Sequence, residues 1–315
     1  MTGLPQLLAY VSVLIRGRPL HGSERYQPFF IVGSGRCGMT LLRAILEAHP
    51  ALHIPPEHVL GPAIQDYRYF SRLPWHAVLR LVLGRFEYHP DWEAWGLELR
   101  PVFEALWARP RGRRDLAAVI DAVYRAHLAQ HKPSATRWGD KAPANTFALP
   151  GLSAVFPDLR VVHIIRDGRD VVESFLRLSD TDVAGLARHW LRAVRVAQAF
   201  GGRHRSHYIE IRYEDLVRRP EATLREVATF LGIEFDERML RHHELSLPLG
   251  DVDRAAHFRG ARDAVHANAI GRWRSGLDPV RLREVERVLG PKLRELGYAS
   301  SPPVPLSLRA RGDPH

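Results

Sequence analysis

The stretch FFIVGSGRCGMTLLR, residues 29–43, decides the fold. Its first four residues, Phe29 to Val32, are all apolar, which is typical of a buried parallel strand, and the run stops at Gly33. Leucine and isoleucine residues then recur at helical spacing behind Thr40, the expected helix cap. A strand, a glycine loop and a helix N-terminus in this order predict an anion cradle, because the free amides of the loop and of the first helical turn converge on one ligand.

The loop has the glycine spacing of a nucleoside-triphosphate loop but lacks its lysine. Met39 stands where that lysine is required. The basic residue inside the loop is Arg36, whose planar guanidinium suits a doubly anionic group. Cys37 raises a covalent alternative, since a helix start favours a thiolate, but no base lies near it in the sequence. The loop therefore predicts a phosphate-type ligand other than a triphosphate.

Length and composition predict a globular protein. The chain has 315 residues, of which 45% are apolar and 25% charged, enough to bury a full core. We expect an N-terminal helix or arm at 1–25, a single domain at 26–298 with a helical insertion at about 61–131, and a disordered tail at 299–315. The apolar run Leu4 to Ile15 is too short to span a bilayer and predicts an amphipathic helix that packs on the protein or makes a peripheral membrane contact. The single cysteine fits a reducing compartment, so a cytoplasmic location is expected.

The formal net charge of +10 comes almost wholly from arginine, because only three of the 45 basic residues are lysines. A basic chain suggests a nucleic-acid partner, but neither zinc-finger spacing nor an aromatic platform for single strands accompanies the arginines. The charge is instead expected to concentrate anionic small molecules near the surface, and no nucleic-acid partner is predicted.

Further segments continue an alternating pattern of strands and helices. RVVHII reads as a second buried strand and HYIEIRYEDL as a third strand, and helices are predicted at Val183 to Phe200, where a glycine pair follows, at Pro220 to Leu231 and at Val280 to Leu296. After RVVHII, Arg166 lies at the carboxyl end of a strand and Ser174 follows two helical turns later, so one cation and one hydroxyl could share a phosphate. No acidic residue directly follows that strand to hold magnesium, which argues against ATP chemistry.

Two short segments carry acid–base groups. HPALHIPPEHV contains His53, Glu57 and His58, and WGDKAPAN contains Lys141. A carboxylate or an imidazole can accept a proton from an acceptor hydroxyl, and a lysine can offset the charge that develops on a leaving phosphate. The residues alone leave all three bases open.

Together these motifs resemble the sulfotransferases that use 3'-phosphoadenosine 5'-phosphosulfate (PAPS), particularly the branch with bacterial enzymes and the tyrosylprotein sulfotransferases. The resemblance runs from about Phe29 to about Leu277 and is closest at residues 30–58 and 138–175. GRCGMTLLRAILEAHP is similar to the family's phosphosulfate loop, RDGRDVVES to its 3'-phosphate motif, WGDKAPAN to its G-D-K-x-P segment and AIGRWRSGL to its late cofactor loop. The resemblance implies an α/β, P-loop-like three-layer fold with a central mainly parallel sheet and a helical insertion.

The resemblance also implies roles for single residues. The implied cofactor contacts are Gly35, Arg36, Cys37, Gly38, Met39, Thr40, Arg166, Ser174, Arg272 and Trp273. Glu57 matches the base of the tyrosylprotein branch, while Lys141 and Arg36 would stabilise the leaving phosphate. His53 and His58 stay open as rival bases, because cytosolic members of the superfamily use a histidine. Cys37 and Met39 replace a serine and a threonine, which we expect to remove two hydroxyls from the cradle.

The implied activity is metal-independent, in-line transfer of a sulfuryl group from PAPS to an acceptor, most often a hydroxyl, with 3'-phosphoadenosine 5'-phosphate (PAP) as the leaving group. A carbohydrate, a lipid, a peptide tyrosine and a specialised metabolite all remain candidate acceptors, and the sequence carries no signal for an oligomeric state. Two other classes stay open: a P-loop kinase of a small alcohol, and a non-catalytic basic protein that binds nucleic acid.

Overall fold

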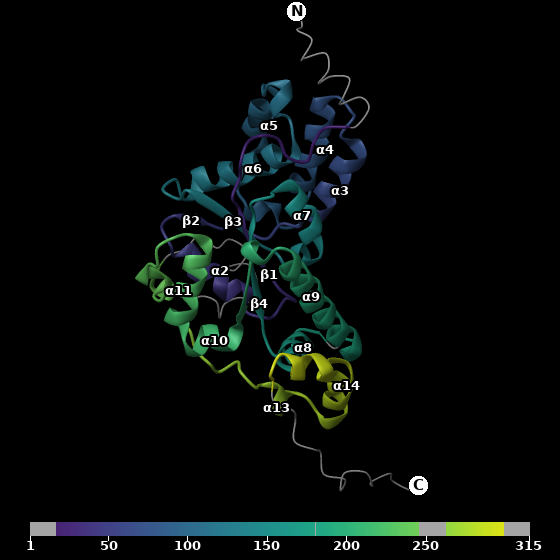
Figure 1. Cartoon of the computed structure of the whole chain (residues 1–315), viewed down its shortest axis with the longest axis vertical. Helices are drawn as coiled ribbons and strands as arrows, with labels where there is room; N and C mark the ends of the chain where they lie inside the picture. Colours follow the sequence, from purple (N-terminus) through teal and green to yellow (C-terminus); the bar gives the residue numbers. More distant parts are fainter. Residues whose placement is uncertain (1–16, 180, 246–262, 299–315) are drawn as a thin grey trace, which may run out of the picture. The chain divides into compact units, whose positions relative to one another are not determined.

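The computed structural model of the chain describes residues 17–179, 181–245 and 263–298. The predicted N-terminal helix over Leu4 to Ile15 and the predicted disordered tail at 299–315 lie outside these described residues. Figure 1 shows the course of the whole chain and gives the labels of its elements.

The described residues form two compact units. The first holds the residues up to Ile165 together with those from Ala193 to Ala267, and the second holds Arg166–Arg192 and the residues from Asn268 on. The assignment of one single domain to residues 26–298 stays a prediction.

A five-stranded sheet, parallel throughout, forms the centre of the first unit. In chain order its strands are β1 (Phe29–Val32), β2 (Leu52–His53), β3 (Arg137–Lys141), β4 (Arg160–Ile165) and β5 (Tyr208–Arg212). Their order across the sheet is β2-β3-β1-β4-β5, with Phe30 of β1 opposite Asp140 on one side and Val161 on the other. All four residues of β1 are fully buried, as expected of a central parallel strand whose two faces are both covered. The predicted α/β class with a mainly parallel sheet is confirmed.

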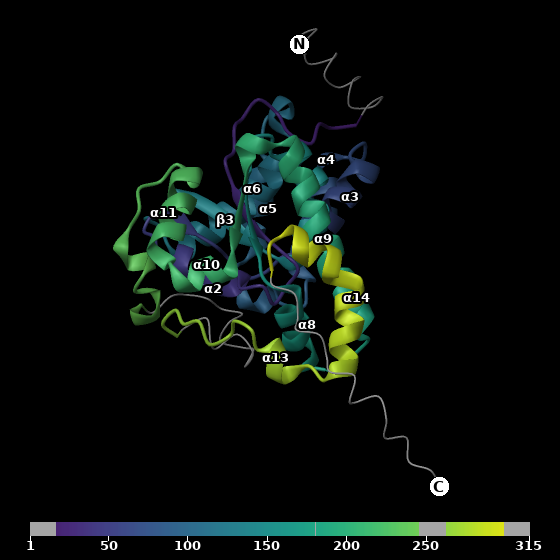
Figure 2. The same cartoon turned by 60° about the horizontal axis from the view of Figure 1, so that its bottom comes forward.

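Helices surround this sheet. Those outside the insertion are α2 (Met39–Glu47), α7 (Leu149–Val155), α10 (Tyr213–Arg218) and α11 (Pro220–Leu231). The insertion between β2 and β3 contributes α3 (Leu60–Phe70), α4 (Trp75–Glu87), α5 (Leu99–Trp107) and α6 (Leu116–His131). The described 3₁₀ helices are η1 (Trp92–Ala94), η2 (Arg111–Arg113), η3 (Pro143–Ala148), η4 (Arg205–His207), η5 (Glu237–Met239) and η6 (His242–Glu244). Figures 1 and 2 show α10 and α11 side by side next to β5.

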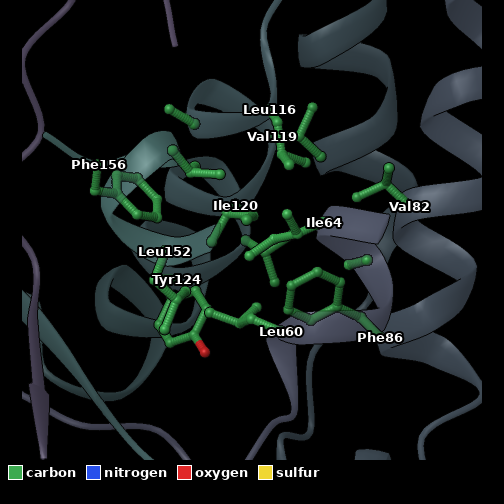
Figure 3. Packing of buried hydrophobic residues seen from close by; sticks show 14 of the residues in the cluster. Leu60, Ile64, Val82, Phe86, Leu116, Val119, Ile120, Tyr124, Leu152 and Phe156 are labelled. Atoms are coloured by element: carbon green, nitrogen blue, oxygen red, sulfur yellow. The ribbon is translucent and has the colours of Figure 1, made fainter. Parts of the chain in front are cut away.

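The helical insertion supplies most of the large hydrophobic cluster of the first unit. Its apolar side chains pack with those of α7 into one cluster (Figure 3), in which Phe86 and Tyr124 are fully buried. Each such side chain contributes about 1.5–3 kcal/mol by leaving water. Trp75 and Trp95 belong to this cluster, whereas Trp107 is 51% exposed. Two of the insertion's tryptophans are therefore core residues.

The second unit is helical. It contains α8 (Gly168–Leu176), α13 (Trp273–Gly276) and α14 (Pro279–Glu295), and α9 (Val183–Arg203) begins in it. Gly168 opens α8 at a point with no room for a side chain, because a β-carbon there would lie 2.5 Å from Leu289 and 2.9 Å from Trp190. Among the described helices of both units, none is long and apolar enough to cross a membrane.

The sequence predicted many of these elements but missed two strands and misplaced one strand end and one helix end. The strand β4 and the helices α11 and α14 form where they were predicted, whereas the strand predicted over HYIEIRYEDL ends at Arg212 and the last four residues of that segment begin α10. Helix α9 does not stop at the glycine pair but continues to Arg203, and Gly201 is needed inside it because the ring of Tyr208 lies 2.4 Å from the position of a β-carbon. The strands β2 and β3 were missed, since RWGDK in β3 has no apolar run and forms a strand only by pairing with β1 and β2.

Candidate active site

The loop between β1 and α2 has an unusual backbone. Gly35, Arg36 and Gly38 have φ angles of 77°, 54° and 99°, and Arg36 is the one non-glycine residue with a positive φ in the described part of the chain. A non-glycine residue in this region is strained by about 1–3 kcal/mol and persists where the surrounding structure fixes it, often at a binding site. Helix α2 begins directly after Gly38, and no side chain of the described residues caps it. The prediction that Thr40 caps this helix is therefore wrong. The first-turn amides give this end of α2 a partial positive charge.

The side chains of Cys37 and Met39 point into the protein. They are 0% and 3% exposed, and their sulfur atoms lie 2.6 Å and 3.4 Å from where a β-carbon on Gly33 would be. With their side chains buried, what these two residues can offer a ligand is their backbone amides, and the expected loss of two hydroxyls from the cradle stays a prediction. The buried thiol also argues against the covalent alternative.

Tyr213 holds the loop from the other side. A β-carbon on Gly38 would lie 2.4 Å from the ring of Tyr213, and Tyr213 itself is 6% exposed. Gly38 is thus required twice, once by its positive φ and once by the ring. The segment RYEDL, at the start of α10, thereby contributes to the phosphate loop although it lies far from it in the sequence.

Glu57 and Lys141 form an ion pair. Lys141 is the last residue of β3, opposite Ile31 of β1, and Glu57 follows β2 by four residues. The lysine side chain is fully buried, whereas the glutamate side chain is 27% exposed. The structure therefore brings together two of the residues predicted to be catalytic, with the carboxylate on the solvent side of the pair.

His53 is fully occupied by its neighbours. Its Nδ1 lies 3.0 Å from Oε1 of Glu47 and its Nε2 lies 2.7 Å from Nδ1 of His127, and the side chain is 0% exposed. Glu47 also accepts a hydrogen bond from the backbone of Ile54. This network ties α2 to β2 and α6, so the structure gives His53 a structural place and leaves it no access to an acceptor.

His58 lies in an aromatic environment. Its ring stacks on Phe86 with centroids 4.1 Å apart, its side chain is 1% exposed, and neither ring nitrogen has a hydrogen-bond partner within the described residues. Burial, and secondly the neighbouring His89, lowers the pKa of His58 to about 3. A proton on this ring is therefore strongly disfavoured, which makes His58 a poor general base.

In the second unit, Arg166 and Ser174 are buried around α8. Arg166 is 6% exposed and donates from Nη2 to the carbonyl of Ala269, and Ser174 is 3% exposed within α8. Asp170 accepts hydrogen bonds from the backbone N–H groups of Gly271 at 2.7 Å and Trp273 at 3.0 Å. Burial raises the pKa of Asp170, and these two hydrogen bonds oppose that change. Asp170 therefore anchors the segment that carries Arg272.

Trp273 is largely covered by cations. Its side chain is 3% exposed, and the guanidinium carbons of Arg169 and Arg274 lie 4.0 Å and 4.6 Å from its ring centroid. Arg272 donates from Nε to the carbonyl of Asn268 at 2.8 Å. The roles of Arg272 and Trp273 as cofactor contacts, like those of Arg166 and Ser174, stay predictions.

Comparison with known proteins gives the family. Residues 28–237 match the model of the sulfotransferase family, and this match spans more than half of the chain. The chain therefore belongs to the sulfotransferase family and is a transferase of sulfuryl groups, for which the family implies PAPS as the donor. The family assignment supports the sulfotransferase class over the two other classes, the kinase and the non-catalytic nucleic-acid-binding protein.

Individual relatives agree with the family. The chain is 25% identical over 296 residues to protein-tyrosine sulfotransferase A of Caenorhabditis elegans, covering 88% of this chain and 69% of the relative. It is 26% identical over 284 residues to protein-tyrosine sulfotransferase 1 of Danio rerio, covering 85% and 71%. Among solved structures, the sulfotransferase domain of the Synechococcus PCC 7002 olefin synthase aligns with a TM-score of 0.59 at 23% identity over 86% of this chain and 98% of that domain. The structural likeness shows a shared fold.

Proposed function

We propose that the loop between β1 and α2 binds the phosphosulfate of PAPS and that Glu57 and Lys141 carry out the transfer. The observation that carries this proposal is the ion pair between Glu57 and Lys141. Glu57 follows β2 and Lys141 ends β3, and these two strands are parallel neighbours. Both residues therefore lie at the edge of the sheet where β1 enters its loop. The carboxyl edge of an open parallel sheet is where such folds bind their ligands.

The loop fits a phosphosulfate group. Its positive φ angles belong to a tight turn whose successive amides can surround an anion, and the partial positive charge of α2 favours the same ligand. Arg36, a half-buried residue, adds a guanidinium to the loop. A phosphosulfate carries less charge than a triphosphate tail, so one arginine and the amides can stabilise it without the lysine that Met39 replaces.

The chemistry assigns a separate task to each partner of the ion pair. Glu57 accepts the proton of the acceptor hydroxyl as the new oxygen–sulfur bond forms. The bond between sulfur and the bridging oxygen breaks, and its electron pair stays on the 5'-phosphate of PAP. Lys141 and Arg36 stabilise the negative charge that develops on that oxygen. The products are the sulfated acceptor, PAP and a protonated Glu57, which returns its proton to solvent.

We propose that this transfer needs no metal ion. Within residues 17–179, 181–245 and 263–298, no group of three or more histidine, cysteine, aspartate or glutamate side chains is arranged to hold one. The support for the proposal is the positive charge of Arg36 and Lys141 at the places where a metal would otherwise neutralise the leaving group. Titration of the activity with a chelator tests it directly.

For the acceptor we propose a hydroxyl, with a peptide tyrosine as the first candidate. The support is the series of similar proteins named protein-tyrosine sulfotransferases, each aligned over most of this chain. A carbohydrate, a lipid and a specialised metabolite remain alternatives within the same reaction. A cytoplasmic location and a peripheral membrane contact through the N-terminal residues also stay proposals.

The test is transfer of labelled sulfate from PAPS to a tyrosyl peptide by the wild-type chain and by Glu57→Gln, with Glu87→Gln as the matched control. Glu87 is an exposed glutamate at the end of α4. We expect Glu57→Gln to lower turnover by about 10²–10⁴, as for loss of a general base, and Glu87→Gln to leave it unchanged. Wild-type turnover in Glu57→Gln would show that the carboxylate is not the base.

A further inference from the structure

The 3₁₀ helix η3 (Pro143–Ala148) lies between the two parts of the candidate active site in the first unit. It begins two residues after Lys141, the last residue of β3. Two adjacent side chains of η3, Asn145 and Thr146, are both 0% exposed. Their polar atoms form hydrogen bonds with different segments of the chain. Neither residue was singled out from the sequence.

Asn145 binds the segment that follows the proposed base. Its Nδ2 donates to the carbonyl of His58 at 2.9 Å, and its Oδ1 accepts from the backbone N–H of Leu60 at 3.0 Å. The same Nδ2 donates to Oδ1 of Asp140 at 2.7 Å. The orientation of the amide is fixed, because the reverse orientation would place two donors together at Leu60 and acceptors together at His58 and Asp140.

Asp140 is itself held by α6. The hydroxyl of Tyr124 donates to Oδ2 of Asp140 at 2.6 Å, so both carboxylate oxygens accept a hydrogen bond. Figure 3 shows the ring of Tyr124 packed among apolar side chains, with its hydroxyl oxygen at the border of the cluster. The chain of contacts therefore runs from the hydrophobic core through Tyr124, Asp140 and Asn145 to the backbone next to Glu57.

Thr146 binds the start of the phosphate loop. Its hydroxyl accepts from the backbone N–H of Gly33 at 3.0 Å and donates to the carbonyl of the same residue at 2.9 Å. Gly33 is the first residue after β1, at the point where the loop leaves the sheet. One hydroxyl thus satisfies both polar groups of a buried backbone residue that has no room for a side chain.

We propose that Asn145 and Thr146 are positioning residues of the sulfuryl transfer. Asn145 holds the backbone next to Glu57 and so positions this base toward the acceptor, whereas Thr146 holds Gly33 and so positions the phosphate loop around the donor. This inference rests on the proposed function. The physical reason is that transfer requires the base and the donor group to be aligned within a fraction of an ångström, and η3 is the rigid element that both segments share. Because the two residues act on different segments, their variants should have different kinetic effects.

Thr146 offers a matched pair of variants. Thr146→Val keeps the shape of the side chain and removes the hydroxyl, whereas Thr146→Ser keeps the hydroxyl and removes the methyl group. We expect Thr146→Val to weaken PAP binding roughly tenfold or more, because two buried backbone groups of Gly33 lose their partner, and Thr146→Ser to bind PAP within about threefold of the wild type. Isothermal titration calorimetry of the full chain with PAP measures both.

Asn145→Ala tests the acceptor side. We expect kcat for transfer from PAPS to a tyrosyl peptide to fall on the order of a hundredfold, with PAP affinity within about threefold of the wild type. Since this variant leaves three buried polar groups unpaired and can fail to fold, Tyr124→Phe serves as a second variant that removes one hydroxyl from the same chain of contacts. It should lower kcat by roughly three- to tenfold and leave PAP affinity unchanged.

Hydrogen exchange provides a readout that does not depend on turnover. Exchange of the Leu60 amide should become faster in Asn145→Ala or Tyr124→Phe but not in Thr146→Val, and exchange of the Gly33 amide should show the opposite pattern. Parallel losses of kcat and PAP affinity in all variants, or equal effects of Thr146→Val and Thr146→Ser, would overturn the inference while leaving the proposed function intact. A wild-type chain that binds no PAP would overturn both.

Discussion

Replacing Asp140 by asparagine is predicted to remove a loss of stability that the protein undergoes between acidic and neutral pH. Asp140 is 1% exposed, and burial raises the pKa of its carboxyl from 3.8 to about 6, although the hydrogen bonds from Tyr124 and Asn145 oppose this change. The folded state therefore binds this proton more tightly than the unfolded state does. The contribution of that proton to stability is fully present below pH 3.8 and is lost as the pH rises through about 6.

The size of the effect follows from the shift. A rise of about 2 units, at about 1.36 kcal/mol per unit, corresponds to a loss of roughly 3 kcal/mol between acidic and neutral pH. In Asp140→Asn the amide oxygen can still accept from Asn145, and the amide nitrogen can donate to the hydroxyl oxygen of Tyr124, whose own hydrogen then loses its acceptor. The buried charge is removed, and the lost acceptor is the same at every pH, so it does not alter the pH dependence of the stability difference. The free energy of unfolding of the variant minus that of the wild type should rise by roughly 3 kcal/mol over this range.

Urea unfolding at a series of pH values, followed by tryptophan fluorescence, measures this difference. Because the effect is a difference between two proteins, the contributions of titrating groups that do not interact with Asp140 cancel. The matched control is Asp91→Asn, whose carboxylate is 61% exposed, and its stability curve should run parallel to that of the wild type. A parallel curve for Asp140→Asn as well would refute the reasoning, since it would mean that burial does not disfavour the charge of Asp140.

Three further predictions concern the active site. Gly38→Ala should weaken PAP binding by more than tenfold in calorimetry, because its β-carbon would lie 2.4 Å from the ring of Tyr213; unchanged affinity would show that this packing does not shape the loop. Lys141→Ala should lower kcat by about 10²–10³ in a sulfate-transfer assay with little change in PAP affinity, and a loss of affinity alone would contradict its role on the leaving oxygen. His58→Leu should keep kcat within about threefold, because the pKa of His58 is about 3 and its ring is 1% exposed. A large fall in kcat would return the imidazole to the list of candidate bases.

The parts of the fold that local sequence determines were predictable. The strand β1 follows from an apolar run that ends at a glycine loop, in which Gly35 and Gly38 have positive φ, and α11 follows from its terminal proline and glycine. The strand β3 was not predictable in this way. Its sequence RWGDK is polar and contains a glycine, and that glycine is required because the ring of Phe29 lies 2.3 Å from the position of its β-carbon. A strand that forms because it pairs with its neighbours need not show hydrophobic periodicity in its own sequence.

The residues of the candidate site were likewise predictable only in part. Glu57 and Lys141 could be named from short motifs and a family resemblance, and the structure places them in contact. Asn145 and Thr146 could not, because their partners lie 85 and 113 residues away in the sequence. The direction of the Cys37 side chain was equally hidden, since it depends on the space beside Gly33 and not on the loop motif.

Calorimetric titration of the full chain with PAP, beside ATP with magnesium and with Gly38→Ala as the variant, tests the central claim most directly. The account predicts that PAP binds tightly without any metal, that Gly38→Ala weakens this binding by more than tenfold, and that ATP with magnesium binds far more weakly. Equal or tighter binding of ATP with magnesium, or PAP binding that does not respond to Gly38→Ala, would contradict the assignment of the loop to the phosphosulfate donor.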